Sequence, residues 1–176
     1  MALDSTTNLS RAYGLALQGA ALGFLMVLFA SLSIRYSSLN FSFGFLPLIA
    51  IYVWPEQASE TMSSVLLFVM GIFQDLVTGG PIALHAITYL FCYALLRRAY
   101  SNNRLTLRQH TVRFLLWVVI VAGLHGFFGF IAIKGETDLQ SLGLQMLTVI
   151  VIFPFALAAL SVFFRADGSL RGAFDA

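Results

Sequence analysis

The stretch GIFQDLVTGGP, residues 71–81, places an acidic side chain in an apolar run and then turns the chain on two glycines and a proline. Asp75 falls near the C-terminal end of the expected helix, where the helix dipole and the apolar surroundings both disfavour its charge. Gly79 suits the left-handed residue that closes one helix, and Pro81 suits the first position of the next. We therefore expect the free N–H groups that open the next helix, together with His85, to lie close to Asp75.

The composition is typical of a protein that lies in a lipid bilayer. Of the 176 residues, 59% are hydrophobic and 10% are charged, and the mean hydropathy is +0.87. A helix needs about 20 apolar residues to cross ~30 Å of hydrocarbon. We expect one all-α membrane domain over residues 1–176, with six transmembrane helices at roughly residues 14–34, 39–54, 62–77, 81–96, 114–133 and 141–164. Five spans would result if the short third and fourth runs formed a re-entrant pair.

Basic residues set the expected orientation. With six spans, one side of the membrane collects most of the basic side chains: Arg11, Arg97, Arg98, Arg104, Arg108, Arg113, Arg165 and Arg171. The other side has Arg35 and Lys134. Because cytoplasmic loops carry the excess of positive charge, we expect both termini in the cytoplasm. The basic cluster at residues 97–113 has two interpretations. It only sets the orientation of the chain in the membrane, or it also binds anionic lipid or an acidic partner.

Several classes of function are disfavoured by the sequence. The net charge of +2 is too small to indicate nucleic-acid binding, and Cys92 is the single cysteine, so no intrachain disulfide forms. Asp75, His85 and His125 match no metal-binding spacing, and no motif of a hydrolase or nucleotide-binding enzyme occurs. We therefore expect no catalytic residue, no metal site and no cofactor.

Small and polar residues recur on one face of each of two neighbouring spans. In lipid such residues mark the side that contacts protein, because hydrophobicity does not distinguish lipid from protein. We expect the third and fourth spans to meet along these faces, which are Ser64, Phe68, Gly71, Asp75 and Thr78 in one span and Pro81, His85, Thr88 and Cys92 in the other. Asp75 would then clamp the hairpin, contact a partner's helix, or relay protons or ions. Gly19 and Gly23 form a GxxxG pattern that we assign to packing within the bundle.

Three segments together resemble the family of the bacterial rod-shape-determining protein MreD. They are FLPLIAIYVWP, FVMGIFQDLVTGGPIALHAITYL and VIFPFALAAL. The specific part of the resemblance is residues 68–90, carried by Gly71, Asp75, Gly79 or Gly80, and Pro81. The family's turn usually continues Pro-Leu-Gly, whereas this chain has Pro81, Ile82 and Ala83. That difference concerns the close backbone approach that a glycine at position 83 would allow and that Ala83 makes harder.

The resemblance implies a non-enzymatic inner-membrane scaffold subunit of the cell-elongation machinery. Such a subunit docks an MreC-like single-span protein and, through it, MreB-like filaments and a RodA/PBP2-type peptidoglycan synthase. The residues expected to bind a partner or clamp the hairpin are Phe68, Gly71, Asp75, Gly79, Gly80, Pro81 and His85. The alternative is a substrate-binding subunit of an energy-coupling-factor-type transporter, with a pocket formed by Asp75, His85, Thr88, His125 and Gln145.

Overall fold

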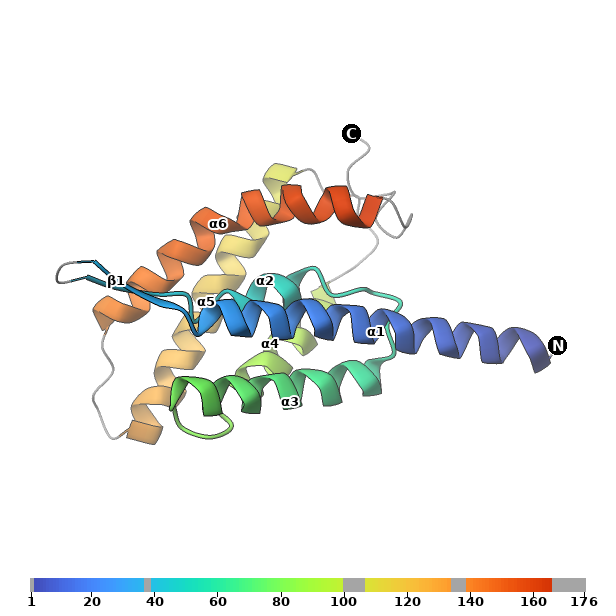
Figure 1. Cartoon of the computed structure of the whole chain (residues 1–176), viewed down its shortest axis with the longest axis horizontal. Helices are drawn as coiled ribbons and strands as arrows, with labels where there is room; N and C mark the ends of the chain where they lie inside the picture. Colours follow the sequence, from blue (N-terminus) through green and yellow to red (C-terminus); the bar gives the residue numbers. More distant parts are fainter. Residues whose placement is uncertain (1, 37–38, 100–106, 134–138, 166–176) are drawn as a thin grey trace.

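The computed structural model describes residues 2–36, 39–99, 107–133 and 139–165, which form a helical bundle with one β-hairpin (Figure 1). In chain order the elements are α1 (Ala2–Ala30), β1 (Ser33–Tyr36), β2 (Leu39–Ser42), α2 (Pro47–Tyr52), α3 (Glu60–Thr78), α4 (Leu84–Ala99), α5 (Leu107–Ile133) and α6 (Leu139–Arg165). The two strands pair antiparallel, with Ser33 opposite Ser42 and Tyr36 opposite Leu39.

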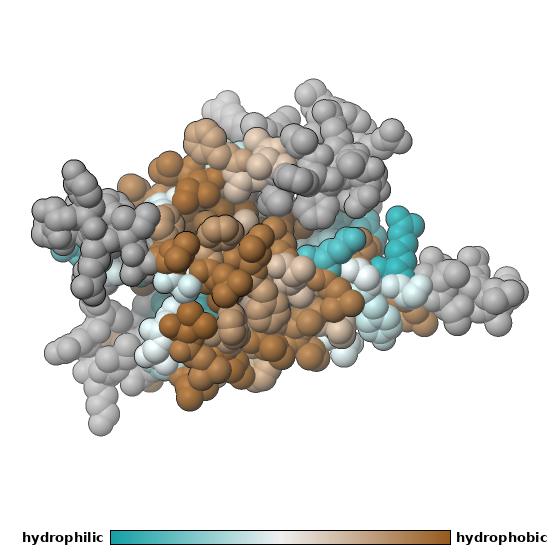
Figure 2. Space-filling model, in the orientation of Figure 1, coloured by the Kyte–Doolittle hydropathy of each residue, from teal (hydrophilic) through white to brown (hydrophobic). Residues whose placement is uncertain are grey.

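Within the described residues, four helices are long and apolar enough to cross a membrane. These candidate spans are Leu9–Ala30 in α1, Glu60–Thr78 in α3, Gln109–Ile131 in α5 and Gln140–Ala159 in α6, and a shorter apolar helix runs over Leu84–Arg97. Figure 2 shows that apolar side chains cover the middle of the bundle and that hydrophilic ones gather toward the end where α1 begins. Bulky apolar side chains face outward on these helices, as expected where lipid replaces water.

The predicted helix over residues 39–54 is wrong. That segment begins as strand β2, turns over residues 44–46, and then forms α2, a helix of six residues. The cause is visible in the sequence: Leu39, Phe41, Phe43 and Phe45 alternate with small or polar residues, which is the period of a strand. Pro47 then opens the short helix, a position that suits proline.

Other boundaries also differ from the expectation. α1 ends at Ala30, so Ile34 lies in β1 rather than at the end of the first span. α4 begins at Leu84, and Pro81 therefore lies before the helix instead of at its first position. The predicted third, fifth and sixth spans fall within α3, α5 and α6, which extend beyond them at one or both ends.

The bundle has two distinct ends. At one end the Ser59 N–H donates to the Ala12 carbonyl at 3.2 Å, and Arg97 lies 3.9 Å from Glu60. We call this the Arg97 end. The opposite end carries the β-hairpin and the turn at Gly79 between α3 and α4 (Figure 1), and we call it the hairpin end. Residues 39–54 therefore run between the two ends as a strand, a turn and a short helix.

The short helix α2 lies at the centre of the bundle. All six of its residues are buried, and it contacts α1, α4 and α6. The Tyr52 ring packs edge-on against Phe114 of α5 and Phe153 of α6, each with a centroid distance of 5.2 Å. Its hydroxyl donates to the His110 carbonyl at 3.2 Å, so the polar tip of this buried ring is satisfied.

Two glycines of α1 receive side chains from the interior. A Cβ atom added at Gly19 would lie 3.0 Å from the Trp54 ring, and one added at Gly23 would lie 2.3 Å from the sulfur of Met70. The GxxxG pattern therefore serves packing within the bundle, as predicted. The Trp54 indole also donates to Ser63 Oγ at 2.9 Å, which ties the end of the α2 segment to α3.

The closest backbone approach joins α3 and α4. A Cβ atom added at Gly71 would lie 2.3 Å from the Cα atom of Ala86 and 2.4 Å from its backbone nitrogen. Only a glycine allows this separation, because the obstructing atoms belong to backbone that cannot rotate away. The two helices thus meet at Gly71 and the start of α4, which confirms only part of the predicted stripe, because Phe68 and Thr78 are exposed.

We expect Gly71→Ala to lower the free energy of unfolding by about 2 kcal/mol, since the added methyl group forces the two helices apart. The measurement is the unfolding midpoint of the purified chain in mild detergent titrated with a denaturing one. Gly123→Ala is the matched control, because nothing lies within 4 Å of a Cβ atom added on that exposed face of α5. Equal stability of the two variants would show that the close approach is absent in solution.

Candidate functional site

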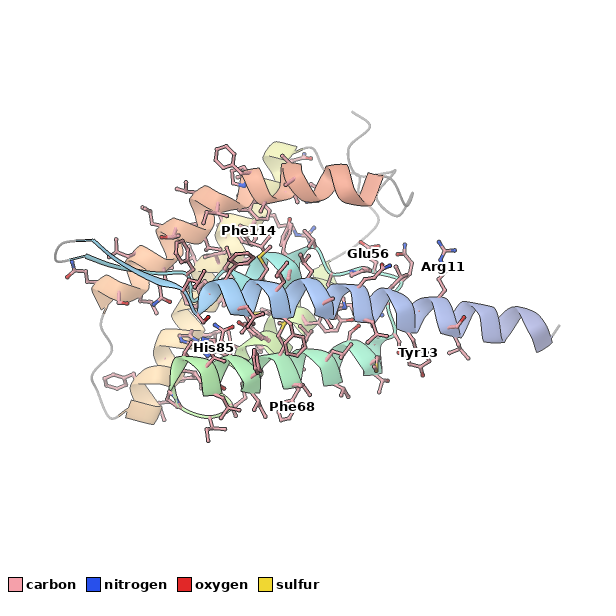
Figure 3. The ribbon with its side chains drawn as sticks, in the orientation of Figure 1. Arg11, Tyr13, Glu56, Phe68, His85 and Phe114 are labelled. Carbon is pink, nitrogen blue, oxygen red and sulfur yellow. The ribbon has the colours of Figure 1, made fainter. Side chains whose placement is uncertain are left out.

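Asp75 and His85 form a buried contact between α3 and α4. Asp75 is 1% exposed, and it is the one acidic side chain buried among the residues that the structure describes. Its Oδ1 accepts the backbone N–H of His85 at 3.1 Å and lies 2.5 Å from His85 Nδ1. An ionised carboxylate only accepts hydrogen bonds, so His85 then carries its proton on Nδ1. Figure 3 shows His85 inside the bundle.

This contact compensates the position of Asp75 in its own helix. The carboxylate lies one turn from the C-terminal end of α3, where the helix dipole is negative. The His85 N–H belongs to the first turn of α4, where N–H groups have no partner within the helix and the dipole is positive. The start of α4 thus supplies the hydrogen-bond donor and the positive end of a helix dipole, neither of which the C-terminal end of α3 offers to the Asp75 carboxylate.

The turn between the helices makes the contact geometrically accessible. Gly79 closes α3 in the left-handed conformation, with φ of 68°, as predicted. The Gly79 N–H and the Gly80 N–H both donate to the Asp75 carbonyl, the latter at 3.2 Å. Asp75 therefore holds the turn through its backbone and the next helix through its side chain.

A second contact at the same level involves Gln74, which the sequence analysis missed. Its Nε2 donates to the Gly44 carbonyl at 2.8 Å, and its Oε1 accepts the Tyr89 hydroxyl. Gly44 lies in the turn that breaks the segment between β2 and α2. Gln74 thus joins three elements. The signal was a second polar residue beside Asp75 in an apolar helix.

His125 of α5 completes the cluster. Its ring lies 4.7 Å from the His85 ring and 5.4 Å from the Phe45 ring. Its Nδ1 is buried without a hydrogen-bond partner, as is Asp75 Oδ2. We call Gln74, Asp75, His85, Tyr89 and His125 the polar cluster, which draws α3, α4 and α5 together near the hairpin end.

The predicted site residues fall into two groups. Gly71, Asp75 and His85 are buried between α3 and α4, and the turn residues Gly79, Gly80 and Pro81 connect them. Phe68 does not belong with them, because it is 43% exposed and points away from the bundle (Figure 3). The face that meets the bundle is rotated by about one residue, over Ser63, Leu67, Met70, Gln74 and their neighbours Gly71 and Asp75. A phenylalanine cannot fit where two backbones touch.

Ala83 adopts a conformation that alanine disfavours. Its φ is 74°, the one positive value at a non-glycine position in the described part of the chain. The left-handed conformation at this position lets the Leu84 N–H reach the Pro81 carbonyl at 3.2 Å before α4 begins.

The predicted basic cluster is placed only in part. Arg97 lies at the end of α4, where its guanidinium donates to the Tyr93 hydroxyl and sits 5.6 Å from that ring's centroid. Arg98 and Arg108 belong to α4 and α5, and Arg113 to the second turn of α5. Arg104 lies outside the described residues.

The pocket residues of the transporter alternative do not all converge. Thr88 Oγ1 donates to the Leu84 carbonyl, and Gln145 Nε2 donates to Ser141 Oγ, so both are engaged within their own helices. Asp75, His85 and His125 do lie together. In the ranges that the structure describes, no three His, Cys, Asp or Glu side chains are arranged to share a metal ion.

These observations define the class of protein: a helical membrane protein with four apolar helices long enough to span a bilayer and a polar cluster inside the bundle. Comparison with protein-family models, curated proteins and solved structures finds no match to this chain. Chemically, the polar cluster fixes helices to one another and satisfies backbone groups that lie away from water.

We expect Gln74→Leu to lower the free energy of unfolding by about 1 to 3 kcal/mol, because the Gly44 carbonyl and the Tyr89 hydroxyl lose their buried partner. The measurement is again denaturation in detergent. Gln145→Leu is the matched control, since within the described part of the chain that amide bonds only to Ser141 one turn away on the half-exposed face of α6. An undiminished stability of the Gln74 variant would contradict the role assigned to it.

Ala83→Gly should raise the stability by about 1 kcal/mol, because glycine adopts a positive φ without steric cost. Ala94→Gly, at an exposed position within α4, should instead lower the free energy of unfolding by about 0.5 to 1 kcal/mol. Thermal midpoints of both variants, measured side by side, test the sign. A lower midpoint for the Ala83 variant would refute the left-handed assignment.

Proposed function

We propose that this chain is a non-enzymatic scaffold subunit of a bacterial cell-elongation complex. The single observation that supports this most is the engagement of Gly71, Asp75 and His85 with one another. The residues that carry the sequence resemblance are used to lock two helices together rather than to line an open site. A rigid bundle of this kind acts by presenting helix faces to other membrane proteins.

The proposed topology is multi-pass in the cell inner membrane with both termini in the cytoplasm. The segment at residues 39–54 counts as a crossing although it is broken, because it leads from the hairpin end to the Arg97 end. Non-helical backbone at membrane depth is tolerated where protein surrounds it. Arg11 and Arg97 lie toward the same end, which supports its assignment to the cytoplasm.

The proposed partner is an MreC-like protein with a single transmembrane helix. Through that partner the chain would hold MreB-like filaments and a RodA/PBP2-type synthase in register for lateral peptidoglycan synthesis and cell shape. The arginines at residues 97–113 would rest on anionic lipid head groups. Because Gly71 and Asp75 are already covered by α4, the partner helix docks on another face.

One observation favours the alternative of a small-molecule-binding subunit of the energy-coupling-factor type. Asp75 Oδ2 and His125 Nδ1 are buried without partners near the hairpin end. A polar ligand that reaches this cluster would satisfy both atoms. Native mass spectrometry of the purified chain distinguishes the two functions. A retained compound that is lost on His125→Leu would support the transporter subunit and count against the scaffold.

The scaffold is tested by affinity purification from the membranes of the source bacterium and by depletion of the chain. We expect a single-span membrane protein to copurify and depleted rod-shaped cells to become round. Asp75→Asn keeps an acceptor oxygen for the His85 N–H but removes the charge. This variant should insert into the membrane normally, but several-fold less of the single-span protein should copurify with it.

Gln145→Leu serves as the control for the Asp75→Asn measurement, because it removes a polar group of α6 that lies outside the polar cluster. Its partner recovery should equal that of the unaltered chain. Full recovery and normal cell form in the Asp75→Asn cells would rule out an ionised role for Asp75. Absence of any copurifying single-span protein would rule out the scaffold.

A further inference from the structure

A small cavity lies at the Arg97 end of the bundle. It has a volume of about 30 Å³, enough for about two water-sized groups. Its lining comes from α2 with the residues that follow it and from the last two turns of α4, and it includes both aromatic and charged side chains: Trp54, Glu56, Tyr93, Leu96 and Arg97. The cavity is too small for a side of another protein, but it fits the tip of a lipid head group.

The cavity lies where the apolar helices reach the head-group region. The candidate span in α3 begins at Glu60, and the shorter apolar helix in α4 ends at Arg97. These two residues lie 3.9 Å apart, so both apolar segments stop at the same level. Tryptophan and tyrosine gather at the head-group level of a bilayer, because their rings are apolar and their tips are polar. Trp54 and Tyr93, whose ring centroids lie 6.2 Å apart, occupy that level here.

The Arg97 guanidinium is held in place and still has donors to offer. It donates to the Tyr93 hydroxyl and lies 5.6 Å from the centroid of that ring. Its contact with Glu60, at 3.9 Å, is too long for a hydrogen bond. A guanidinium has five N–H donors in a planar fork that matches phosphate. Within the described part of the chain, Arg97 is therefore oriented and keeps donors for a phosphate group.

Two carboxylates at the same cavity determine the kind of head group. Glu56 lines the cavity, and the exposed Glu60 lies beside Arg97. Figure 3 shows Glu56 toward the end of the bundle where Arg11 also lies. A purely anionic head group would bind Arg97 but meet two negative charges. A head group with a phosphate and a primary ammonium matches both signs of charge, since an ammonium donates to carboxylates and is attracted to the faces of aromatic rings.

We infer that this cavity, here called the Arg97 pocket, binds the head group of a zwitterionic phospholipid of the phosphatidylethanolamine class. The phosphate lies on the Arg97 guanidinium, and the ammonium lies between Glu56 and the rings of Trp54 and Tyr93. A trimethylated head group fits less well, because it is bulkier and donates no hydrogen bond to a carboxylate. This gives Arg97 a lipid partner of its own within the basic cluster, and it requires the membrane location but not the scaffold.

Native mass spectrometry of the purified full chain in detergent tests the lipid class. The probes are phosphatidylethanolamine, phosphatidylglycerol and phosphatidylcholine with identical acyl chains, added at equal concentrations. We expect one molecule of phosphatidylethanolamine to be retained at several-fold the level of the other two lipids. Glycerophosphoethanolamine, the soluble head group without acyl chains, should be retained far less, because the pocket lies at the level where the chains of a lipid anchor it.

Three variants test the position of the site. Arg97→Gln should lower the retention of phosphatidylethanolamine about fivefold, the equivalent of ~1 kcal/mol for one arginine at a membrane surface. Glu56→Gln should reduce the preference over phosphatidylcholine, because the ammonium loses its carboxylate acceptor. Arg11→Gln is the matched control, since it removes a positive charge from an exposed position at the same end that does not line the cavity. It should leave the retention unchanged.

Tryptophan fluorescence provides a second measurement. The chain has two tryptophans, and Trp117→Phe leaves Trp54 as the single reporter. This replacement keeps an aromatic ring and removes an indole N–H that has no hydrogen-bond partner in the described part of the chain. We expect a short-chain phosphatidylethanolamine to change the Trp54 emission in a saturable way. Short-chain phosphatidylcholine at the same concentrations should change it several-fold less.

Several results would overturn the inference. Equal retention of the three lipids would mean that lipid surrounds the bundle without a specific site. A preference for phosphatidylglycerol that is lost in Arg97→Gln would make the pocket an anionic-lipid site, which agrees with the proposed function and contradicts the zwitterionic ligand. Equal retention of glycerophosphoethanolamine would make the ligand a soluble compound. A preference for phosphatidylethanolamine that neither variant of the pocket reduces, with unchanged Trp54 emission, would place the lipid elsewhere. None of these results affects the copurification of a single-span protein, so the scaffold is tested separately.

Discussion

The backbone that leaves regular structure inside the bundle sets the main constraint on this fold. Residues 44–46 form a turn between β2 and the short helix α2, and the N–H groups of Leu46, Leu48 and Ile49 donate to the carbonyls of Phe43, Phe45 and Leu46 rather than to that of Gly44. Gly44 is buried, so a side chain supplies the donor that the backbone does not. Gln74 does so, and Tyr89 in turn fixes Gln74. The broken segment and the polar face of α3 therefore require each other.

The same requirement explains which parts of the fold the sequence predicts. Long apolar runs place α3, α5 and α6, because length and hydropathy are sufficient for a helix that lipid surrounds. They fail for residues 39–54, because the sequence of this strand and short helix is as apolar as that of a span. The alternation of Leu39, Phe41, Phe43 and Phe45 carried the missing information, and it is a local signal that hydropathy averages remove.

The part of the polar cluster that is formed by residues close together in sequence could be predicted. Asp75, Gly79 and His85 are close in sequence, and helix-end electrostatics alone require the acid to face the start of the next helix. Gln74 was missed, because its partners come from the turn before α2 and from α4 across long sequence separations. His125 was placed beside Asp75 and His85 only as part of the alternative pocket. A single sequence defines the angle of a helix face only to within about one residue, which is why Phe68 was placed on the inner side.

Helix α1 shows why hydrophobicity does not reveal which face of a membrane helix contacts protein, whereas small and polar residues do. Lipid and protein interior are equally apolar, so the leucines of α1 are compatible with either environment. Small residues allow close approach and amides require partners, and both therefore point toward protein. In α1 they lie on two sides: Gly19 and Gly23 face Trp54 and Met70, whereas Gly14 and Gln18 face outward. Among the described residues, the small residues of α1 that pack against the bundle are thus Gly19 and Gly23, and Gly14 and Gln18 lie on the exposed side.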